Sequence, residues 1–258
     1  MRQNRVAWSA GKVAGRYRGD EGLQPGEAAA LGLVEGAIRD RPILDIGIGA
    51  GRTTAVLRAL TPDYVGIDFS ADMVAVSRER FPDLDIRQMD ARDLSVLADR
   101  RFALALFSYN GIDYVGHADR LRIMAELRRV LADDGWLLFS SHNRSFPLRR
   151  PWHPGLLSAD ANALPALRRF AGWLVGIGRH LALRRFEEAQ PGYAIANDEG
   201  ENFRFLTYYI DVDAQRAQLV QAGFELVAAF GAQGRAIPPG DRAADCGWVN
   251  YLARKSGH

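Results

Sequence analysis

Three glycines, Gly47, Gly49 and Gly51, follow an apolar run that contains Asp45. Glycine adopts positive φ readily, and because it has no Cβ a ligand can approach the main chain closely. The helix expected after such a loop presents unpaired N–H groups and the positive end of its dipole. The segment therefore predicts a loop that cradles a nucleotide-like ligand, with a carboxylate or phosphate near the helix start.

The spacing of the glycines argues against a dinucleotide. The dinucleotide fingerprint is G-x-G-x-x-G, and counting from Gly47 the sixth position is Arg52. Two more acids, Asp68 and Asp90, stand at the ends of the next two strand-like runs. Each acid follows the previous one by about one βα unit, roughly 20 to 30 residues. The acids are therefore expected at neighbouring strand ends.

With these motifs, residues 40 to 142 resemble the class I S-adenosylmethionine-dependent methyltransferases. The resemblance implies that Asp45 and the loop 47–51 hold the methionine part of the cofactor, and that Asp68 accepts from both ribose hydroxyls. S-adenosylmethionine is net positive, so a pocket rimmed by carboxylates suits it better than NAD. The resemblance also implies the following cofactor contacts: Tyr17, Phe69, Met73, Asp90, Ala91, Phe107 and Ser108. A plain core role for Phe69 and Met73 stays equally open.

The methyl acceptor is expected beyond the ends of the fourth and fifth strands, because ligands of open α/β sheets bind there. Methyl transfer is an in-line displacement, so the protein supplies alignment and, for a hydroxyl, a base. His142 leaves the fifth strand and is the predicted base; a histidine that only makes a loop hydrogen bond is the alternative. Asp113 and Tyr109 are the other catalytic candidates, the tyrosine as a cation–π partner of the sulfonium.

Apolar runs and helical patterns alternate from residue 43 onward, which predicts an α/β fold. We expect a Rossmann-like, doubly wound, mostly parallel seven-stranded sheet with its last strand antiparallel and helices on both faces. Strands are expected at 43–46, 64–67, 84–88, 103–108, 136–141, 224–230 and 246–255, and helices at 51–60, 71–79, 118–131 and 213–222.

In the helix at 118–131, Leu121, Met124, Leu127 and Leu131 are expected to form the buried face, with the charges in solvent and the turn ADDG at its end.

The chain is expected to form a single domain over 1–258, with a helical cap at 1–40 and an inserted lid at 143–202. Prolines interrupt the start of the insertion, and eight arginines stand against three acids between 144 and 188. A lid over an anionic methyl acceptor, a helix on acidic lipid and a helix packed on the domain all fit this composition.

Composition narrows the function classes. The 33 basic and 31 acidic residues give a net charge of +2, so nucleic acid is an unlikely main partner. The single Cys246 excludes an internal disulfide, and no metal site is expected. Neither a signal peptide nor a membrane span is visible in the sequence, which predicts a cytoplasmic protein. The loop SYNG at 108–111 lacks the Pro-Pro-aromatic signature of enzymes that methylate nucleobase amines.

The leading hypothesis is methyl transfer from S-adenosylmethionine to a small-molecule acceptor, with oxygen slightly favoured over nitrogen because His142 is available. An aminopropyl-type transferase on the same fold is one alternative. The other is a non-catalytic protein that binds S-adenosylmethionine, or that docks on lipid or nucleic acid through the basic insertion. The oligomeric state stays open.

Overall fold

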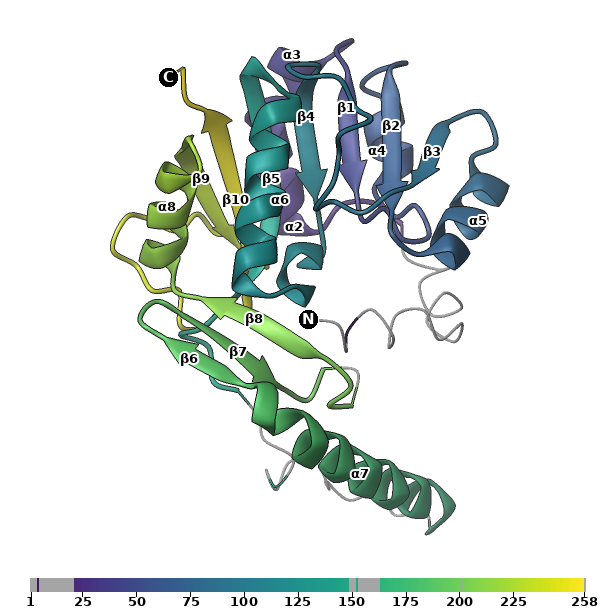
Figure 1. Ribbon diagram of the computed structural model, residues 1–258, viewed down its shortest axis with the longest axis vertical. Helices are drawn as coiled ribbons and strands as arrows, with labels where there is room; N and C mark the ends of the chain where they lie inside the picture. Colours follow the sequence, from purple (N-terminus) through teal and green to yellow (C-terminus); the bar gives the residue numbers. More distant parts are fainter. Residues whose placement is uncertain (1–3, 5–20, 149–151, 153–162, 201, 258) are drawn as a thin grey trace.

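The computed structural model describes residues 4, 21–148, 152, 163–200 and 202–257 (Figure 1). Seven strands form its central sheet: β1 (Ile43–Ile46), β2 (Tyr64–Asp68), β3 (Asp85–Gln88), β4 (Phe102–Phe107), β5 (Leu131–Asn143), β9 (Phe224–Gly231) and β10 (Trp248–Lys255). They lie in the order β3-β2-β1-β4-β5-β10-β9. β10 is antiparallel to both neighbours, whereas β1 to β5 pair in parallel. The predicted fold class is confirmed.

The winding of the sheet reverses beside β1, because β1 pairs with β2 on one side and with β4 on the other. All three strands are buried along their whole length, which explains their continuous apolar sequences. Ile46 pairs with Ile67 in β2 and with Phe107 in β4, so the three strands end side by side. A ligand crevice is expected at this edge of the sheet.

Helices cover both faces of the sheet (Figure 1). They are α2 (Pro25–Gly32), α3 (Glu35–Ile38), α4 (Thr54–Arg58), α5 (Ala71–Arg80), α6 (His117–Val130) and α8 (Val212–Gln221). One core cluster packs Leu31 of α2 and Leu57 of α4 on the sheet, and another packs Leu127 of α6 and Leu219 of α8. Helix α4 is shorter than expected, because the glycines before it hold the chain at positive φ up to Gly51.

Helix α6 differs from its expected packing. Met124, Leu127 and Leu131 are buried as expected, but Leu121 is 38% exposed. Arg120 beside it is fully buried, so the buried face carries a charge. β5 begins at Leu131, directly after the helix, so the segment ADDG belongs to the strand and is not a separate turn. Leu131 pairs with Phe102 of β4, and this pairing extends β5 toward the helix.

Three further strands were not expected: β6 (Glu188–Gln190), β7 (Tyr193–Asn197) and β8 (Leu206–Ile210). β8 runs parallel to the end of β5, where His142 pairs with Tyr209, and β7 and β6 follow it outward. β6 is exposed along its length, which removes the alternation that marks a half-buried strand. The long helix α7 (Ala163–Leu183) precedes this hairpin and projects from the body of the molecule (Figure 1).

Candidate functional site

A cavity of about 190 Å³ lies at the carboxyl ends of β1, β2 and β4. It brings together most of the residues that the sequence singled out. They are Gly47, Gly49, Asp68, Phe69, Met73, Asp90, Ala91, Phe107, Ser108 and Tyr109. Asp45, Gly51, Asp113 and His142 do not line the cavity, and Tyr17 lies outside the described residues.

The glycine loop has the backbone that its sequence predicts. Gly47, Gly49 and Gly51 have φ values of 65°, 56° and 84°, where a side chain is strained. A Cβ on Gly51 would lie 2.5 Å from the ring of Phe81, so this glycine is needed for packing. A Cβ on Gly49 would meet no atom within 4 Å, so the main chain at Gly49 is open to a ligand.

Asp68, the last residue of β2, ties the loop to the start of α5. Its Oδ2 accepts from the Gly49 N–H at 3.0 Å, and its Oδ1 accepts from the Ser70 N–H at 2.8 Å. Burial raises the pKa of Asp68, and these backbone hydrogen bonds oppose the shift. Each carboxylate oxygen keeps a second lone pair, so this side chain can also accept from two ligand hydroxyls.

Asp90 carries a partner that the sequence did not indicate. Arg92 lies 2.6 Å from Asp90 Oδ2 and 2.9 Å from Asp119 Oδ2, and it also lines the cavity. The rim is therefore less negative than three unpaired acids would make it. Nothing in the sequence indicated that Arg92 would form an ion pair with Asp90.

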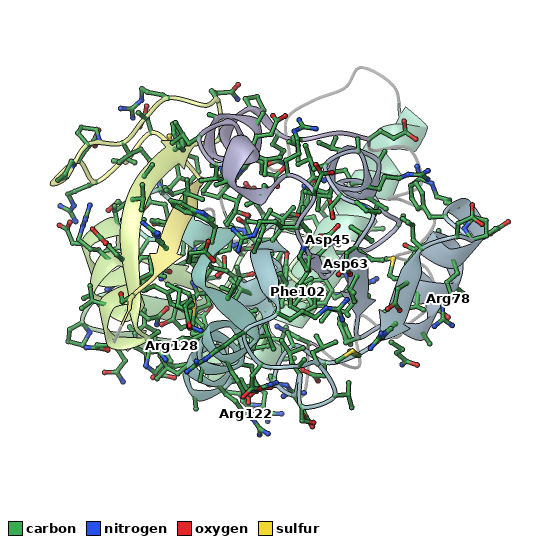
Figure 2. The ribbon with its side chains drawn as sticks, turned by 90° about the horizontal axis from the view of Figure 1, so that it is seen from above. Asp45, Asp63, Arg78, Phe102, Arg122 and Arg128 are labelled. Atoms are coloured by element: carbon green, nitrogen blue, oxygen red, sulfur yellow. The ribbon has the colours of Figure 1, made fainter. Side chains whose placement is uncertain are left out.

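Asp45, labelled in Figure 2, is a fully buried residue of β1. Its Oδ2 accepts from Thr53 Oγ1 at 2.7 Å and from the Tyr64 hydroxyl at 2.9 Å. Its Oδ1 is buried without a hydrogen-bond partner among the described residues. Burial raises the pKa of Asp45 to about 6, although both hydroxyls oppose the shift. Its contact with the methionine part of the cofactor stays a prediction.

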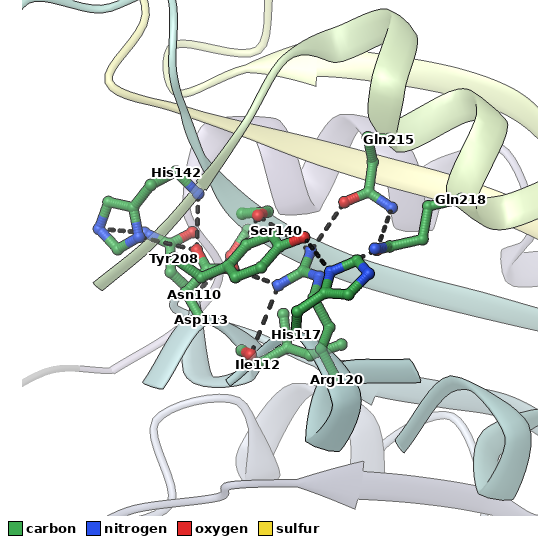
Figure 3. A network of polar contacts seen from close by, with 11 residues as sticks. Asn110, Ile112, Asp113, His117, Arg120, Ser140, His142, Tyr208, Gln215 and Gln218 are labelled. Carbon is green, nitrogen blue, oxygen red and sulfur yellow. Dashed lines mark hydrogen bonds and ion pairs between the residues drawn. The ribbon is translucent and has the colours of Figure 1, made fainter. Parts of the chain in front are cut away.

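Asp113 and His142, chosen separately from the sequence, are hydrogen-bonded to each other (Figure 3). Asp113 lies in the short 3₁₀ helix η2 (Gly111–Tyr114) and is fully buried. Its Oδ2 accepts from the His142 ring nitrogen Nδ1 and from the His142 main-chain N–H, both at 2.7 Å. Because Nδ1 donates its proton to the carboxylate, Nε2 is the ring nitrogen with a lone pair to accept a proton.

Arg120 is the buried cation behind this pair (Figure 3). Its guanidinium forms an ion pair with Asp113 Oδ1, which also accepts from the Ser141 hydroxyl at 2.7 Å. The same guanidinium donates to the side-chain oxygens of Gln215 and Gln218 of α8, at 2.7 and 3.0 Å. Elements far apart in the sequence therefore hold the Asp113 side chain in place behind His142.

The turn at 109–111 connects the histidine to the cavity. Tyr109 and Gly111 line the cavity, and the Asn110 side-chain nitrogen between them lies 3.4 Å from His142 Nε2. Tyr109 and Asn110 have successive φ values of 54° and 55°, a strain that is typical of functional sites. Arg52 lies 5.3 Å from the Tyr109 ring centroid, so a cation already sits beside this ring.

Sequence reasoning missed Arg52 and Asn4, which line the cavity, and Glu27 beside Arg52. Arg52 forms an ion pair with the buried Glu27 at 2.7 Å and donates to Ser108 Oγ at 3.2 Å. Asn4 also lines the cavity, and its side chain donates to the carbonyls of Tyr114 and Leu206. An acid on α2 and an asparagine near the N-terminus carry no periodic pattern that could have indicated these contacts.

The described part of the chain offers no candidate metal site and no helix that could span a membrane. No cluster of three or more histidine, cysteine or acidic side chains there could ligate a metal ion. Among the same residues, every helix is too short or too polar to cross a bilayer.

Comparisons with known proteins agree on one family. A family model described as a methyltransferase domain matches residues 43–135. A demethylmenaquinone methyltransferase of Renibacterium salmoninarum is 31% identical over 134 residues, 51% of this chain and 53% of that protein. The chain thus spans about half the length of this relative. A probable S-adenosylmethionine-dependent methyltransferase of Mycobacterium tuberculosis is 26% identical over 199 residues, 73% of this chain and 70% of that protein.

Solved structures share the fold. An S-adenosylmethionine-dependent methyltransferase from Clostridium acetobutylicum has a TM-score of 0.60 at 13% identity, with 100% of both chains covered. The 1,6-didemethyltoxoflavin-N1-methyltransferase of Burkholderia thailandensis, solved with 1,6-didemethyltoxoflavin and S-adenosylhomocysteine, has a TM-score of 0.58 at 14% identity. That alignment covers 99% of this chain and 87% of the other.

Proposed function

We propose that the chain belongs to the class I S-adenosylmethionine-dependent methyltransferases and transfers a methyl group from S-adenosylmethionine to a hydroxyl of a small molecule. The Asp113–His142 pair is the observation that carries this proposal. A transfer to an amine needs no base at the methylation step, whereas a hydroxyl acceptor is helped by one.

The residues around the cavity fit the cofactor. Asp68 has lone pairs for both ribose hydroxyls, and each such charge-assisted hydrogen bond contributes about 1.5–3 kcal/mol. The open space at Gly49 suits the methionine part, and Phe69 and Met73, which line the cavity, would flank the adenine. The Oδ1 of Asp45, buried without a hydrogen-bond partner among the described residues, would be an acceptor for the methionine part.

The proposed mechanism assigns the proton to His142. S-adenosylmethionine supplies a methyl group that its sulfonium has already activated. His142 Nε2 takes the proton of the acceptor hydroxyl as the oxygen attacks, and Asp113 stabilises the imidazolium that results. The ion pair with Arg120 fixes the Asp113 carboxylate, which in turn holds the imidazole ring in one orientation. The cavity walls align the two reactants and exclude water.

The cavity also bears on the charge of the methyl acceptor. Arg52 and Arg92 line it, but Glu27 pairs with the first and Asp90 with the second. Both cations are largely neutralised, which favours an uncharged acceptor over an anionic one. Tyr109, Tyr114 and Val115 add apolar surface on this side of the cavity, which suits a ring.

A panel of phenols, alcohols and amines tests the proposal, with a labelled methyl donor and wild-type protein. We expect label on at least one hydroxyl acceptor, and we expect His142→Ala to lose about a hundredfold or more of that turnover. S-adenosylhomocysteine should bind the wild type and this variant equally well. Equal turnover by the two proteins would remove His142 as the base, and label on amines alone would overturn the hydroxyl assignment.

A further inference from the structure

Helix α7 has an apolar face that points to solvent. Every exposed residue between positions 170 and 182 is apolar, and the set is Phe170, Ala171, Leu174, Val175, Gly178, Leu181 and Ala182. Leu174 and Leu181 are 50% and 51% exposed. A surface helix of a globular protein normally has the opposite pattern, with polar residues outward. An apolar surface of this kind marks a contact with a partner or a membrane.

The other side of α7 is already used within the molecule. A Cβ on Gly176 would lie 2.6 Å from the Asn202 side chain, so the two segments are in close contact. His180 is buried, with its Nδ1 3.0 Å from Asn197 Oδ1. Packing on β7 and its loop therefore fixes which face of the helix is outward.

Basic residues outnumber acids along this segment. Residues 161–188 contain five arginines against two acids, Glu187 and Glu188. Arg184 and Arg185, in the short 3₁₀ helix η4 (Arg184–Phe186) after α7, are exposed. An apolar face next to an excess of arginines is typical of a helix that lies in the interface of a membrane with anionic lipid.

We propose that the outward face of α7 docks on the surface of an anionic phospholipid bilayer. Its leucines and Phe170 would enter the boundary of the acyl chains, and the arginines would pair with lipid phosphates. A second copy of the chain is a poorer partner, because two such helices would bring two sets of five arginines together with only Glu187 and Glu188 of each segment to offset them. This docking does not depend on methyl transfer.

Sedimentation with vesicles tests the proposal. Wild-type protein should pellet with vesicles of phosphatidylcholine and phosphatidylglycerol, pellet less with phosphatidylcholine alone, and dissociate as salt rises. The double variant Leu174→Gln/Leu181→Gln should bind the anionic vesicles at least about tenfold more weakly than wild type, because glutamine keeps the helix but removes the apolar face. Val220→Gln, on the exposed side of α8, is the matched control and should bind like wild type.

Other outcomes would overturn the docking. They are binding that the double variant retains, binding that ignores lipid charge and salt, or no binding at all. A dimer in light scattering that the double variant dissociates, without vesicle binding, would assign the face to a second copy. The response of the melting temperature to S-adenosylhomocysteine is measured in parallel. It reports the fold and the cofactor site, so a failure of the proposed function would be distinguishable from a failure of docking.

Discussion

At the residue scale, the site depends on one carboxylate and one imidazole that are joined by a hydrogen bond. His142 and Asp113 could each be selected from the sequence, because both follow strands of the predicted sheet. Their hydrogen bond could not, since it depends on η2 folding back against the end of β5. The burial of Arg120 was equally hidden, because a charged residue in a helix is by default expected in solvent.

The orientation of His142 can be tested through Asp113. Asp113→Asn keeps the shape of the side chain but removes the charge that stabilises the imidazolium. We expect turnover of a hydroxyl acceptor to fall by about two orders of magnitude or more, while S-adenosylhomocysteine binding in calorimetry stays unchanged. A variant with full turnover would show that the carboxylate has no part in the reaction.

Because Arg120 forms a buried ion pair with Asp113, we expect its substitution to lower the free energy of unfolding strongly. Arg120→Met leaves the Asp113 carboxylate buried without its cation, which should lower the free energy of unfolding by about 3–5 kcal/mol. Arg122→Met, on the exposed side of the same helix (Figure 2), should change it by less than about 0.5 kcal/mol. Adding Asp113→Asn to Arg120→Met should restore part of the loss. Equal urea midpoints for the two single variants would contradict the buried ion pair.

Asp45 predicts a dependence of stability on pH. Burial raises the pKa of Asp45 to about 6 in the folded state from its ordinary value of 3.8, so its stabilising contribution is complete below about pH 4 and is lost as pH rises through 6. Asp45→Asn cannot ionise. The difference in free energy of unfolding between this variant and wild type should therefore shift in favour of the variant by up to about 3 kcal/mol between pH 4 and pH 7.5. Urea unfolding without cofactor measures this, and a difference independent of pH would refute it.

At the scale of elements, the glycine loop shows how much a pattern can predict. The pattern predicts β1, β2 and a cavity at their carboxyl ends. It consists of the apolar strand, the glycines and the acids at the next strand ends. The hairpin of β6 and β7 had no comparable pattern, because its strands are short and β6 is exposed. The buried face of α6 was wrong at one position, Leu121, because the leucine pattern does not reveal that Arg120 is buried with its hydrogen bonds satisfied.

The loop can be tested at Gly51. Gly51→Ala combines a φ of 84° with a Cβ 2.5 Å from Phe81, so we expect the free energy of unfolding to fall by about 1–3 kcal/mol. Binding of S-adenosylhomocysteine should weaken as the loop shifts. Gly32→Ala is the control, because its Cβ would meet no atom within 4 Å at the end of α2. Thermal melts that rank the two variants in the reverse order would contradict the assigned geometry.

At the scale of the whole molecule, the order of strands and helices followed from hydrophobic patterning, because a parallel sheet with covered faces needs uniformly apolar strands. Contacts between distant segments did not follow. Examples are β8 on the end of β5, and Asn4 between Tyr114 and Leu206. The net charge of +2 also does not indicate the excess of arginines over acids near α7, because a charge summed over the chain says little about one surface.

A crystal structure with S-adenosylhomocysteine tests the central claim most directly. The account predicts its ribose hydroxyls on Asp68, its amino acid part along the main chain at Gly49, and its sulfur facing the side of the cavity formed by Tyr109 and Gly111. His142 should lie beyond that turn, with Nδ1 still bonded to Asp113. A ligand bound elsewhere, or a carboxylate of Asp68 turned away from a bound ribose, would contradict the account.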